Sequence, residues 1–292
     1  MFHRTALRAS EHDVLNLAQS AAYSAIVALF PGLIVAATFF ALLPGTAPLR
    51  AQVTAIVYRF LPADVIPLVE GYFAPSWHAR SAHVLIGAVF VSVLGASTVI
   101  TTFMEGLRRA HNLPPNCWTF RRRRARSFEL VPIALIPLGI ASALVVFGNL
   151  LTVWIIHHVI PEVRSPVYVI ASVVRWIIAF IGSVGIIAVL YHMGTPLRQP
   201  WRRVIPGAIT ATAMWFLTTL SFGWYVTRFT NYSQVYGSLG AGIALLFWLY
   251  IVSLSVLCGA EFNEQFHLHI HHHESDEQPR DESAEKPSNS TV

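Results

Sequence analysis

Acidic side chains are the groups in this sequence best suited to hydrolytic chemistry. Metal-dependent nucleases hold their ions with clustered carboxylates, and metal-free ones use a paired acid and base. The sequence also lacks a phosphate-loop lysine, a zinc-binding HExxH and a nucleophile GxSxG. We therefore expect no catalytic residue and no enzyme activity. Ahead of the C-terminal tail the acids are few and form no ligand motif: Glu11, Asp13, Asp64, Glu70, Glu105, Glu129, Glu162, Glu261 and Glu264.

Arg175 is the charged side chain whose position most suggests ligand binding. It lies inside a long apolar segment, and a charge at the centre of a membrane-spanning helix costs roughly 2.5–3.5 kcal/mol. Such a charge needs a partner, and four are open: a phosphate of the outer lipid leaflet, Glu162, Asp64 or Glu70. A structural ion pair or lipid contact explains Arg175 as well as a place on a substrate path does.

The dipeptide Pro31–Gly32 interrupts the first long apolar segment near its middle. Proline removes a backbone hydrogen bond, and the freed carbonyl must be satisfied by a neighbouring group, by water or by a substrate. Interrupted helices recur at transporter binding sites, although proline is also frequent in ordinary membrane-spanning helices. We predict that Pro31 and Gly32 line a substrate path together with Arg175.

The stretch YSQVYGSLGAG (232–242) combines aromatic, hydroxyl and amide groups with a glycine cluster. Its glycine spacing is the reverse of the dinucleotide fingerprint and no strand pattern precedes it, so we do not expect it to bind phosphate. Small residues four apart on a helix let two backbones approach closely in lipid. The residues predicted for helix packing are Gly237, Gly240, Ala241 and Gly242. The polar groups that either line the outer mouth of the path or stand at the membrane interface are Tyr232, Tyr236 and Ser238.

Histidine and cysteine give no convincing metal site. The run HLHIHHH (267–273) could bind a transition metal adventitiously. A functional site needs ligands that a fold holds in place, and this run borders a polar tail. Cys117 and Cys258 lie far apart and show neither metal-ligand spacing nor a disulfide framework. The sequence thus predicts no metal and no cofactor.

The composition is strongly apolar, and this indicates which kind of secondary structure carries the residues described above. Of the 292 residues, 54% are hydrophobic and 12% charged, whereas soluble domains carry about 25% charged residues. A membrane-spanning helix needs about 20 mainly apolar residues. The sequence therefore predicts an all-α integral membrane protein with six transmembrane helices. The six segments lie at about 21–43, 83–104, 131–157, 167–193, 204–226 and 236–260.

The distribution of basic residues predicts the orientation in the membrane. The termini and loops on one side of a six-helix topology carry 14 Lys and Arg residues, and the opposite loops carry 5. The positive-inside rule places the richer side, and with it both termini, in the cytoplasm. The run RRRRARSF (121–128) abuts a spanning segment, which favours anionic lipid headgroups over nucleic acid as its contact. The predicted headgroup contacts are Arg121, Arg122, Arg123, Arg124 and Arg126.

The flanking segments complete the predicted layout. Residues 1–20 form a cytoplasmic N-terminal segment and residues 21–265 the transmembrane domain. In the first outer loop, apolar residues recur with helical spacing over 53–61 and 65–73, which predicts two short helices at the membrane interface. Residues 266–292 end in a stretch rich in Ser, Glu and Pro, which predicts a disordered cytoplasmic tail.

Six stretches of the chain, in this order, carry a family resemblance. They are AAYSAIVALFPGLI (21–34), FMEGLRRAHNLP (103–114), RRRRARSF (121–128), RWIIAFIGSVGIIAVLYHM (175–193), PGAITATAMWFLTTLSFGWYV (206–226) and YSQVYGSLGAGIALLFWLYIVSLSVLCGAEFN (232–263). Over about residues 15–265 the chain resembles the YihY/BrkB family of bacterial inner-membrane proteins. The last stretch, which closes on Gly-Ala-Glu-Phe-Asn, is the most specific.

The resemblance implies a six-helix integral membrane protein and no settled activity. Family members have been associated with virulence and serum resistance, suggested to act as transporters, and once labelled ribonuclease BN, a tRNA-processing enzyme. The scattered acids argue against ribonuclease activity in this chain.

Transport is the function that we predict first. The substrate would be a small polar or amphiphilic solute or a lipid-like molecule, exported across the bacterial inner membrane. The sequence holds no ATP-binding motif, so a gradient or a partner would drive the step. The alternative is a non-transporting envelope or virulence-associated factor that organises lipids or partner proteins. The expected partners are membrane lipids and an unidentified small molecule, without nucleic acid.

Overall fold

The computed structural model describes residues 2–42, 82–157, 164–197, 199–228 and 232–282. All regular elements in these ranges are helices, which confirms the predicted all-α class for the described part of the chain. In chain order they are α1 (Phe2–Glu11), α2 (Val14–Leu42), α5 (Ala82–Ala110), the short 3₁₀ helix η2 (Pro115–Cys117), α6 (Phe120–His157), α7 (Arg164–Met193), α8 (Trp201–Arg228) and α9 (Tyr232–Glu282).

Five of these helices are long and apolar enough to cross a membrane, and each corresponds to one of the predicted spans. The qualifying segments are Val14–Ala36, Leu85–Ala110, Tyr168–Met193, Trp201–Tyr225 and Gly242–Leu268. A helix satisfies its own backbone N–H and C=O groups, as a lipid environment requires. The remaining predicted span, 131–157, lies within α6, whose side chains are described only as far as Gly139. The sixth span therefore stays a prediction.

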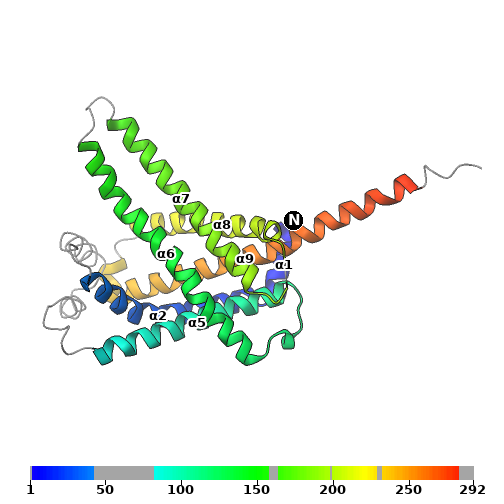
Figure 1. Ribbon diagram of the computed structural model, residues 1–292, viewed down its shortest axis with the longest axis horizontal. Coiled ribbons are helices and arrows are strands. Elements are labelled where there is room, and N and C mark those ends of the chain that lie inside the picture. Colours follow the sequence, from blue (N-terminus) through cyan, green and yellow to red (C-terminus); the bar gives the residue numbers. More distant parts are fainter. Residues whose placement is uncertain (1, 43–81, 158–163, 198, 229–231, 283–292) are drawn as a thin grey trace, which may run out of the picture.

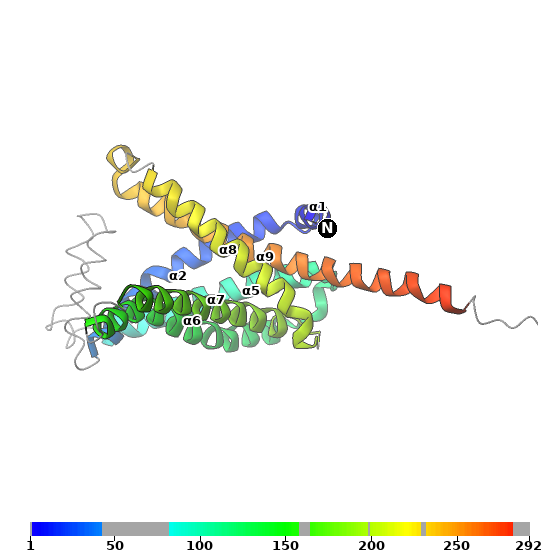
Figure 2. The same cartoon turned by 90° about the horizontal axis from the view of Figure 1, so that it is seen from above.

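The long helices form three pairs, α2–α5, α6–α7 and α8–α9 (Figure 1). Figures 1 and 2 show that the pairs converge at the end where α1 lies and splay apart toward the opposite end. Contacts between the pairs run from α2 to α9, from α7 to α8 and from α5 to α6. We call the end near α1 the converging end.

Buried side chains concentrate at the converging end. A large cluster joins α5, α6, α7, α8 and α9, and a smaller one joins α2 to α9. Where the helices splay apart, the described side chains are mostly exposed and apolar, as a surface that faces lipid must be. Members of the large cluster include Met104, Leu107, Leu130, Tyr191 and Val204. Exposed apolar side chains include Phe90, Ile170, Leu220 and Phe247.

Two helix crossings depend on small residues that the sequence analysis did not select. A Cβ atom added at Gly95 of α5 would lie 2.6 Å from the Cβ of Ala28 on α2. Where α8 crosses α9, a Cβ added at Gly259 would overlap the side chain of Ala211. Gly207 and Ala211 lie four residues apart on α8, which is the spacing that lets membrane helices approach closely.

Substituting Gly259 with alanine tests the α8–α9 crossing. The new methyl group would overlap Ala211 and lie 2.8 Å from the Tyr191 hydroxyl, so neighbouring side chains must shift. We expect the free energy of unfolding to fall by about 1–3 kcal/mol, the usual range for overpacking. Thermal unfolding in detergent measures the change. The matched control is Gly182→Ala on α7, where nothing among the described residues lies within 4 Å of the added Cβ, so the Tm should hold or rise.

The predicted break at Pro31–Gly32 is absent, because α2 continues through both residues as one helix. A single missing backbone hydrogen bond is tolerated in a membrane helix when neighbouring helices support it. Gly32 lies against α5, with the added Cβ 3.1 Å from Oγ of Ser92. Its small size therefore serves a helix contact in this structure.

Two further predictions concern the first outer loop and the C-terminal tail. The short helices predicted at 53–61 and 65–73 lie outside the described residues. At the other end, α9 continues as a helix to Glu282, whereas composition predicts disorder over 266–292. This last part of α9 extends away from the other helices (Figure 1). Because an isolated helix without tertiary packing is marginal in water, the disorder remains a prediction.

Candidate functional site

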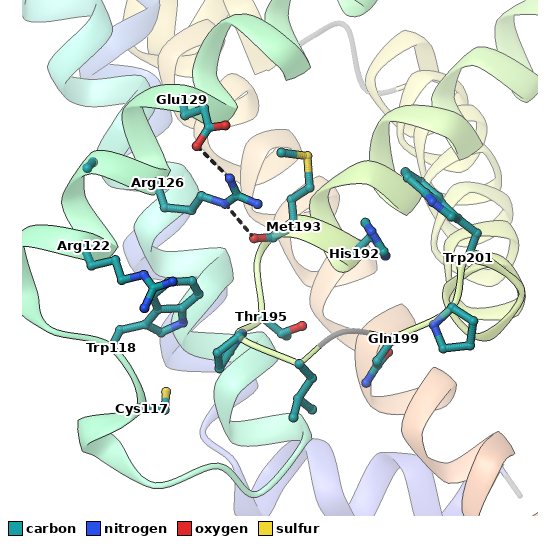
Figure 3. A pocket seen from close by; sticks show the side chains of 14 residues that line it. Cys117, Trp118, Arg122, Arg126, Glu129, His192, Met193, Thr195, Gln199 and Trp201 are labelled. Carbon is teal, nitrogen blue, oxygen red and sulfur yellow. Dashed lines mark hydrogen bonds and ion pairs between the residues drawn. The ribbon is translucent and has the colours of Figure 1, made fainter.

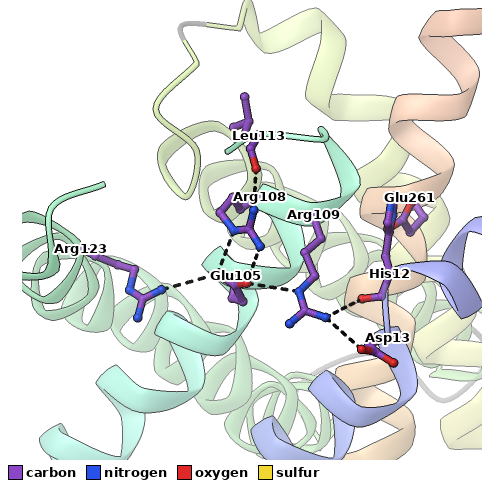
Figure 4. A network of polar contacts seen from close by, with 8 residues as sticks. All are labelled: His12, Asp13, Glu105, Arg108, Arg109, Leu113, Arg123 and Glu261. Carbon is purple, nitrogen blue, oxygen red and sulfur yellow. Dashed lines mark hydrogen bonds and ion pairs between the residues drawn. The ribbon is translucent and has the colours of Figure 1, made fainter. Parts of the chain in front are cut away.

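A network of charged side chains lies across the converging end (Figure 4). Its centre is Glu105, in the last two turns of α5. Nε and Nη2 of Arg108 donate hydrogen bonds to the Glu105 carboxylate at 3.0 and 2.7 Å, and Nε of Arg109 donates at 3.2 Å. Nη1 of Arg123, on α6, lies 3.5 Å from the same carboxylate. One carboxylate therefore holds three guanidinium groups from two helices.

Arg109 extends this network to the N-terminal helices and to α9. Its Nη1 donates to the backbone carbonyl of His12 at 3.2 Å and to Oδ2 of Asp13 at 3.3 Å. Nδ1 of His12 lies 2.7 Å from Oε1 of Glu261 on α9. Glu261 is only 1% exposed, so this contact replaces most of the hydration of its carboxyl group. Hydrogen bonds thus connect α6, α5, the α1–α2 turn and α9.

Two residues with left-handed backbone conformation position the network. Asp13 has a φ of 58° between α1 and α2, and Asn112 has a φ of 51° after α5. Asp and Asn adopt this conformation more readily than most residues. The N–H of Asn112 donates to the Arg109 carbonyl and that of Leu113 to the Arg108 carbonyl, the pairing of a Schellman cap. The cap turns the Leu113 carbonyl toward Arg108, whose Nη1 donates to it at 2.5 Å.

A second histidine–carboxylate pair lies about one turn further along α9. Nε2 of His111 is 3.5 Å from Oε2 of Glu264, within ion-pair distance but without hydrogen-bond geometry. Nδ1 of His111 donates to the Leu107 carbonyl at 2.8 Å, which orients the ring. In the described part of the chain, no three His, Cys, Asp or Glu residues gather closely enough to hold a metal ion.

The GAEFN stretch (259–263) brings three contacts onto one turn of α9. Gly259 packs on α8, and Glu261 faces His12. Oδ1 of Asn263 accepts a hydrogen bond at 3.0 Å from the backbone N–H of Gly207 near the start of α8. The most specific part of the family resemblance is therefore where α9 is joined to α8 and to the α1–α2 turn.

The segments predicted to be cytoplasmic meet at this end. The N-terminal segment contacts α9 through His12 and Glu261. Nε of Arg126, early in α6, donates to the Met193 carbonyl at the end of α7, 3.3 Å away. A ring nitrogen of His267 lies 2.7 Å from the Arg203 carbonyl at the start of α8. This arrangement is the one that the arginine distribution predicts for a single membrane side.

A pocket of about 1000 Å³ opens at the same end (Figure 3). It is lined by the residues that enter α6, by the end of α7 with the loop that follows, and by the first residues of α8. The guanidinium of Arg122 lies over the Trp118 ring, 5.4 Å from its centre. On the other side, the His192 ring stacks on Trp201 with 4.2 Å between ring centres. The sequence analysis did not find this pocket, because its walls come from three separate segments.

Arg175 lies on α7 within a membrane-spanning segment, as predicted. Its Nε is buried and has no hydrogen-bond partner among the described residues. The acids named as possible partners, Glu162, Asp64 and Glu70, all lie outside the described residues. Pro31 and Gly32 are on α2, whose main contacts are with α5 and α9 rather than with α7, so their place on one path with Arg175 stays a prediction.

The predicted sites in the first turns of α9 are described only in part. Tyr232, Tyr236, Ser238 and Gly237 are helical, but their side-chain surroundings lie outside the described residues, as do those of Ala241. Gly240 is half-buried. At Gly242 nothing among the described residues lies within 4 Å of an added Cβ. The close helix contacts that the structure does describe include those at Gly95, Gly106, Gly207 and Gly259.

The predicted headgroup arginines divide into two groups. Arg123 and Arg126 contact protein groups, and Arg124 lies over the Phe128 ring at 4.9 Å. Arg121 and Arg122 are exposed. Arg121 and Arg122 are therefore the most exposed of the five arginines, and the headgroup contact stays a prediction.

Comparison with known proteins places the chain in a family. The ribonuclease-like protein YfkH of Bacillus subtilis (strain 168) is 27% identical over 264 residues, which cover 88% of this chain and 91% of the relative. A UPF0761 membrane protein of Chromohalobacter salexigens is 29% identical over 258 residues, covering 87% of this chain and 60% of the relative. Another UPF0761 membrane protein, from Alteromonas mediterranea, is 26% identical, covering 87% of this chain and 83% of the relative.

No solved structure matches the chain. The family described as virulence factor BrkB matches residues 5–285, nearly the whole chain. Five helices can cross a membrane, and the UPF0761 relatives are membrane proteins by name. The chain is therefore a multi-pass membrane protein that belongs to the virulence factor BrkB family, in agreement with the resemblance seen in its sequence.

Proposed function

We propose that this protein is a transporter that moves a small polar or amphiphilic solute, or a lipid-like molecule, across the bacterial inner membrane. Arg175 is the observation that supports this best. It lies on a spanning segment, and its Nε is buried without a hydrogen-bond partner among the described residues. A guanidinium stays charged and offers several donors to an anionic group. A substrate with an acidic group would supply the missing partner.

Aromatic side chains that follow Arg175 on α7 favour an amphiphilic substrate. Trp176 and Phe180 of α7 meet the ring of Phe216 on α8, with centres 6.2 and 5.4 Å apart. Trp176 is exposed. A helix that carries both a charged group and an aromatic surface suits a molecule with one anionic and one apolar part.

The shape of the helix bundle also favours transport. Transporters keep a path closed on one side while the other side is open. Here the helices pack tightly at the converging end, where the Glu105 network connects them, and splay apart at the other end (Figures 1 and 2). We assign the converging end, with both termini, to the cytoplasm on the distribution of arginines.

A non-transporting role in the cell envelope is the second proposal, and the exposed arginines favour it. Arg121 and Arg122 could hold anionic headgroups without any flux. We propose neither an enzyme nor a nucleic-acid partner. The buried acid Glu261 and the half-buried Glu105 are each held by cationic or histidine side chains, so neither is free for catalysis. For this reason the ribonuclease-like name of one relative is not carried over.

Flux in proteoliposomes tests the transport proposal. Wild type and Arg175→Gln would be reconstituted at equal folded yield and loaded with a panel of anionic metabolites and lipids. Loss of a charged hydrogen-bond donor from the path should lower the flux at least about tenfold. Arg175→Lys keeps the charge and should retain part of the flux.

Three results would count against this reading of Arg175. Unchanged flux in Arg175→Gln would place the residue off the path. Loss of folded protein in this variant would make Arg175 a structural residue. An absence of flux from wild type across the panel would favour the envelope role instead.

A further inference from the structure

Three residues that line the pocket at the converging end each carry a buried polar atom without a hydrogen-bond partner among the described residues. The atoms are Nε1 of Trp118, Nδ1 of His192 and Oγ1 of Thr195. Thr195 is only 6% exposed, and Figure 3 shows its hydroxyl directed into the ring of lining residues. Buried polar groups are nearly always paired in proteins. Three unpaired ones around a single pocket therefore indicate a polar ligand.

The charges and donors of the pocket favour an anion. Nε1 of Trp118 can only donate a hydrogen bond, and the Thr195 hydroxyl can also donate. Arg122 forms no ion pair with any described acid, and its guanidinium is held in place over the Trp118 ring. Glu129 is the carboxylate in the lining, and it is engaged by Arg126 at 2.7 Å. Among the described residues, the positive charge of Arg122 is thus left without a counter-charge.

The pocket lies between the starts of two long helices. Trp118 precedes the first residue of α6 by two positions, and Trp201 is the first residue of α8. The N-terminal N–H groups of a helix carry partial positive charge and favour anions. The side-chain donors and both helix starts reach the pocket from different directions. A tetrahedral anion can meet such donors with separate oxygens, whereas a carboxylate offers two oxygens in one plane.

We propose that this pocket binds a phosphate group. Arg122 supplies the charge, and the Thr195 hydroxyl and Trp118 indole N–H supply hydrogen bonds. The phosphate can belong to the headgroup of an anionic phospholipid or to a soluble phosphate compound. This site goes beyond the transport path, since it does not include Arg175 and its test measures binding rather than flux.

Isothermal titration of the full-length protein in a neutral detergent tests the site. The probes are inorganic phosphate and, separately, dihexanoyl phosphatidylglycerol. Thr195→Val removes the hydroxyl at nearly constant size, and Thr195→Ser keeps it. Arg122→Gln removes the charge in the pocket, and Arg121→Gln removes the same charge from a neighbouring residue that does not line the pocket. All variants must elute as wild type does on gel filtration.

We expect at least one probe to bind saturably, with about tenfold weaker binding for Thr195→Val and for Arg122→Gln. Thr195→Ser and Arg121→Gln should stay within about threefold of wild type. Binding of the lipid alone assigns the site to a headgroup, and binding of inorganic phosphate assigns it to a soluble compound. The proposal fails if neither probe binds, if Thr195→Val binds like wild type, or if both arginine variants weaken binding equally. The comparison of Thr195→Val with Thr195→Ser tests the proposal even if Arg122→Gln does not fold.

Discussion

Replacing His12 with leucine should lower the free energy of unfolding by about 3 kcal/mol. The change leaves the Glu261 carboxyl group, which is 1% exposed, without the partner that lies 2.7 Å away. Leaving a buried polar group without its hydrogen-bond partner typically costs about 1–3 kcal/mol, and more for a charged group. Because Glu261 is almost completely buried, we expect the upper end of that range. Thermal and denaturant unfolding of the purified protein in detergent would measure it.

A double-mutant cycle distinguishes the interaction between His12 and Glu261 from a simple loss of packing. Glu261→Met removes the carboxyl group at similar size. If the two residues interact as the structure shows, the double variant should be more stable than the sum of the single losses by about 1.5 kcal/mol or more. Additive losses would mean that His12 and Glu261 contribute independently. That result would contradict the link between the α1–α2 turn and α9.

Replacing Glu105 with glutamine should give the second-largest loss, about 2 kcal/mol. Glutamine keeps the shape of the side chain but removes the charge that Arg108, Arg109 and Arg123 share. Three guanidinium groups would then repel one another around a neutral amide. The Glu105 side chain is 23% exposed, so solvent screens part of this effect and the loss stays below that of a fully buried group. The Tm in detergent at low salt would report it.

Glu129→Gln is the matched control for this variant. Glu129 lies nearby on α6 and pairs with one arginine, Arg126, at 2.7 Å, but its side chain is 53% exposed. An exposed pair of this kind contributes about 0–1 kcal/mol. Equal losses for Glu105→Gln and Glu129→Gln would show that Glu105 does not hold the converging end together.

The membrane-spanning helices could be predicted from the sequence because their signal is local. Each span needs only a run of apolar residues, and each helix satisfies its backbone within itself. Five predicted spans accordingly match helices that can cross a membrane. The break expected at Pro31 was wrong because a neighbouring helix, α5, supports α2 there. Helix propensities describe single residues, so they do not include the support that a neighbouring helix gives.

The charged network could not be predicted in the same way. His12 and Glu261 are separated by 249 positions, and Arg109 and Asp13 by 96. Local cues were present: Asp13 and Asn112 are residue types that tolerate the left-handed caps on which the network depends. Glu105 has two of its partners, Arg108 and Arg109, on its own helix, but the partners of Asp13 and Glu261 lie on other elements. Only the convergence of the helices brings them together.

Amino-acid composition and arginine distribution by themselves determined that this chain is a multi-pass helical membrane protein, and they predicted which segments share one side. These properties depend on the transfer of single segments into lipid, which each segment undergoes independently of the others. The tertiary structure alone decided which glycines lie at helix crossings, which carboxylates are paired, and that three separate segments enclose a pocket with unpaired donors. Such features depend on how helices are rotated against one another. In lipid that rotation is determined by close packing and polar contacts between helices, not by apolar content.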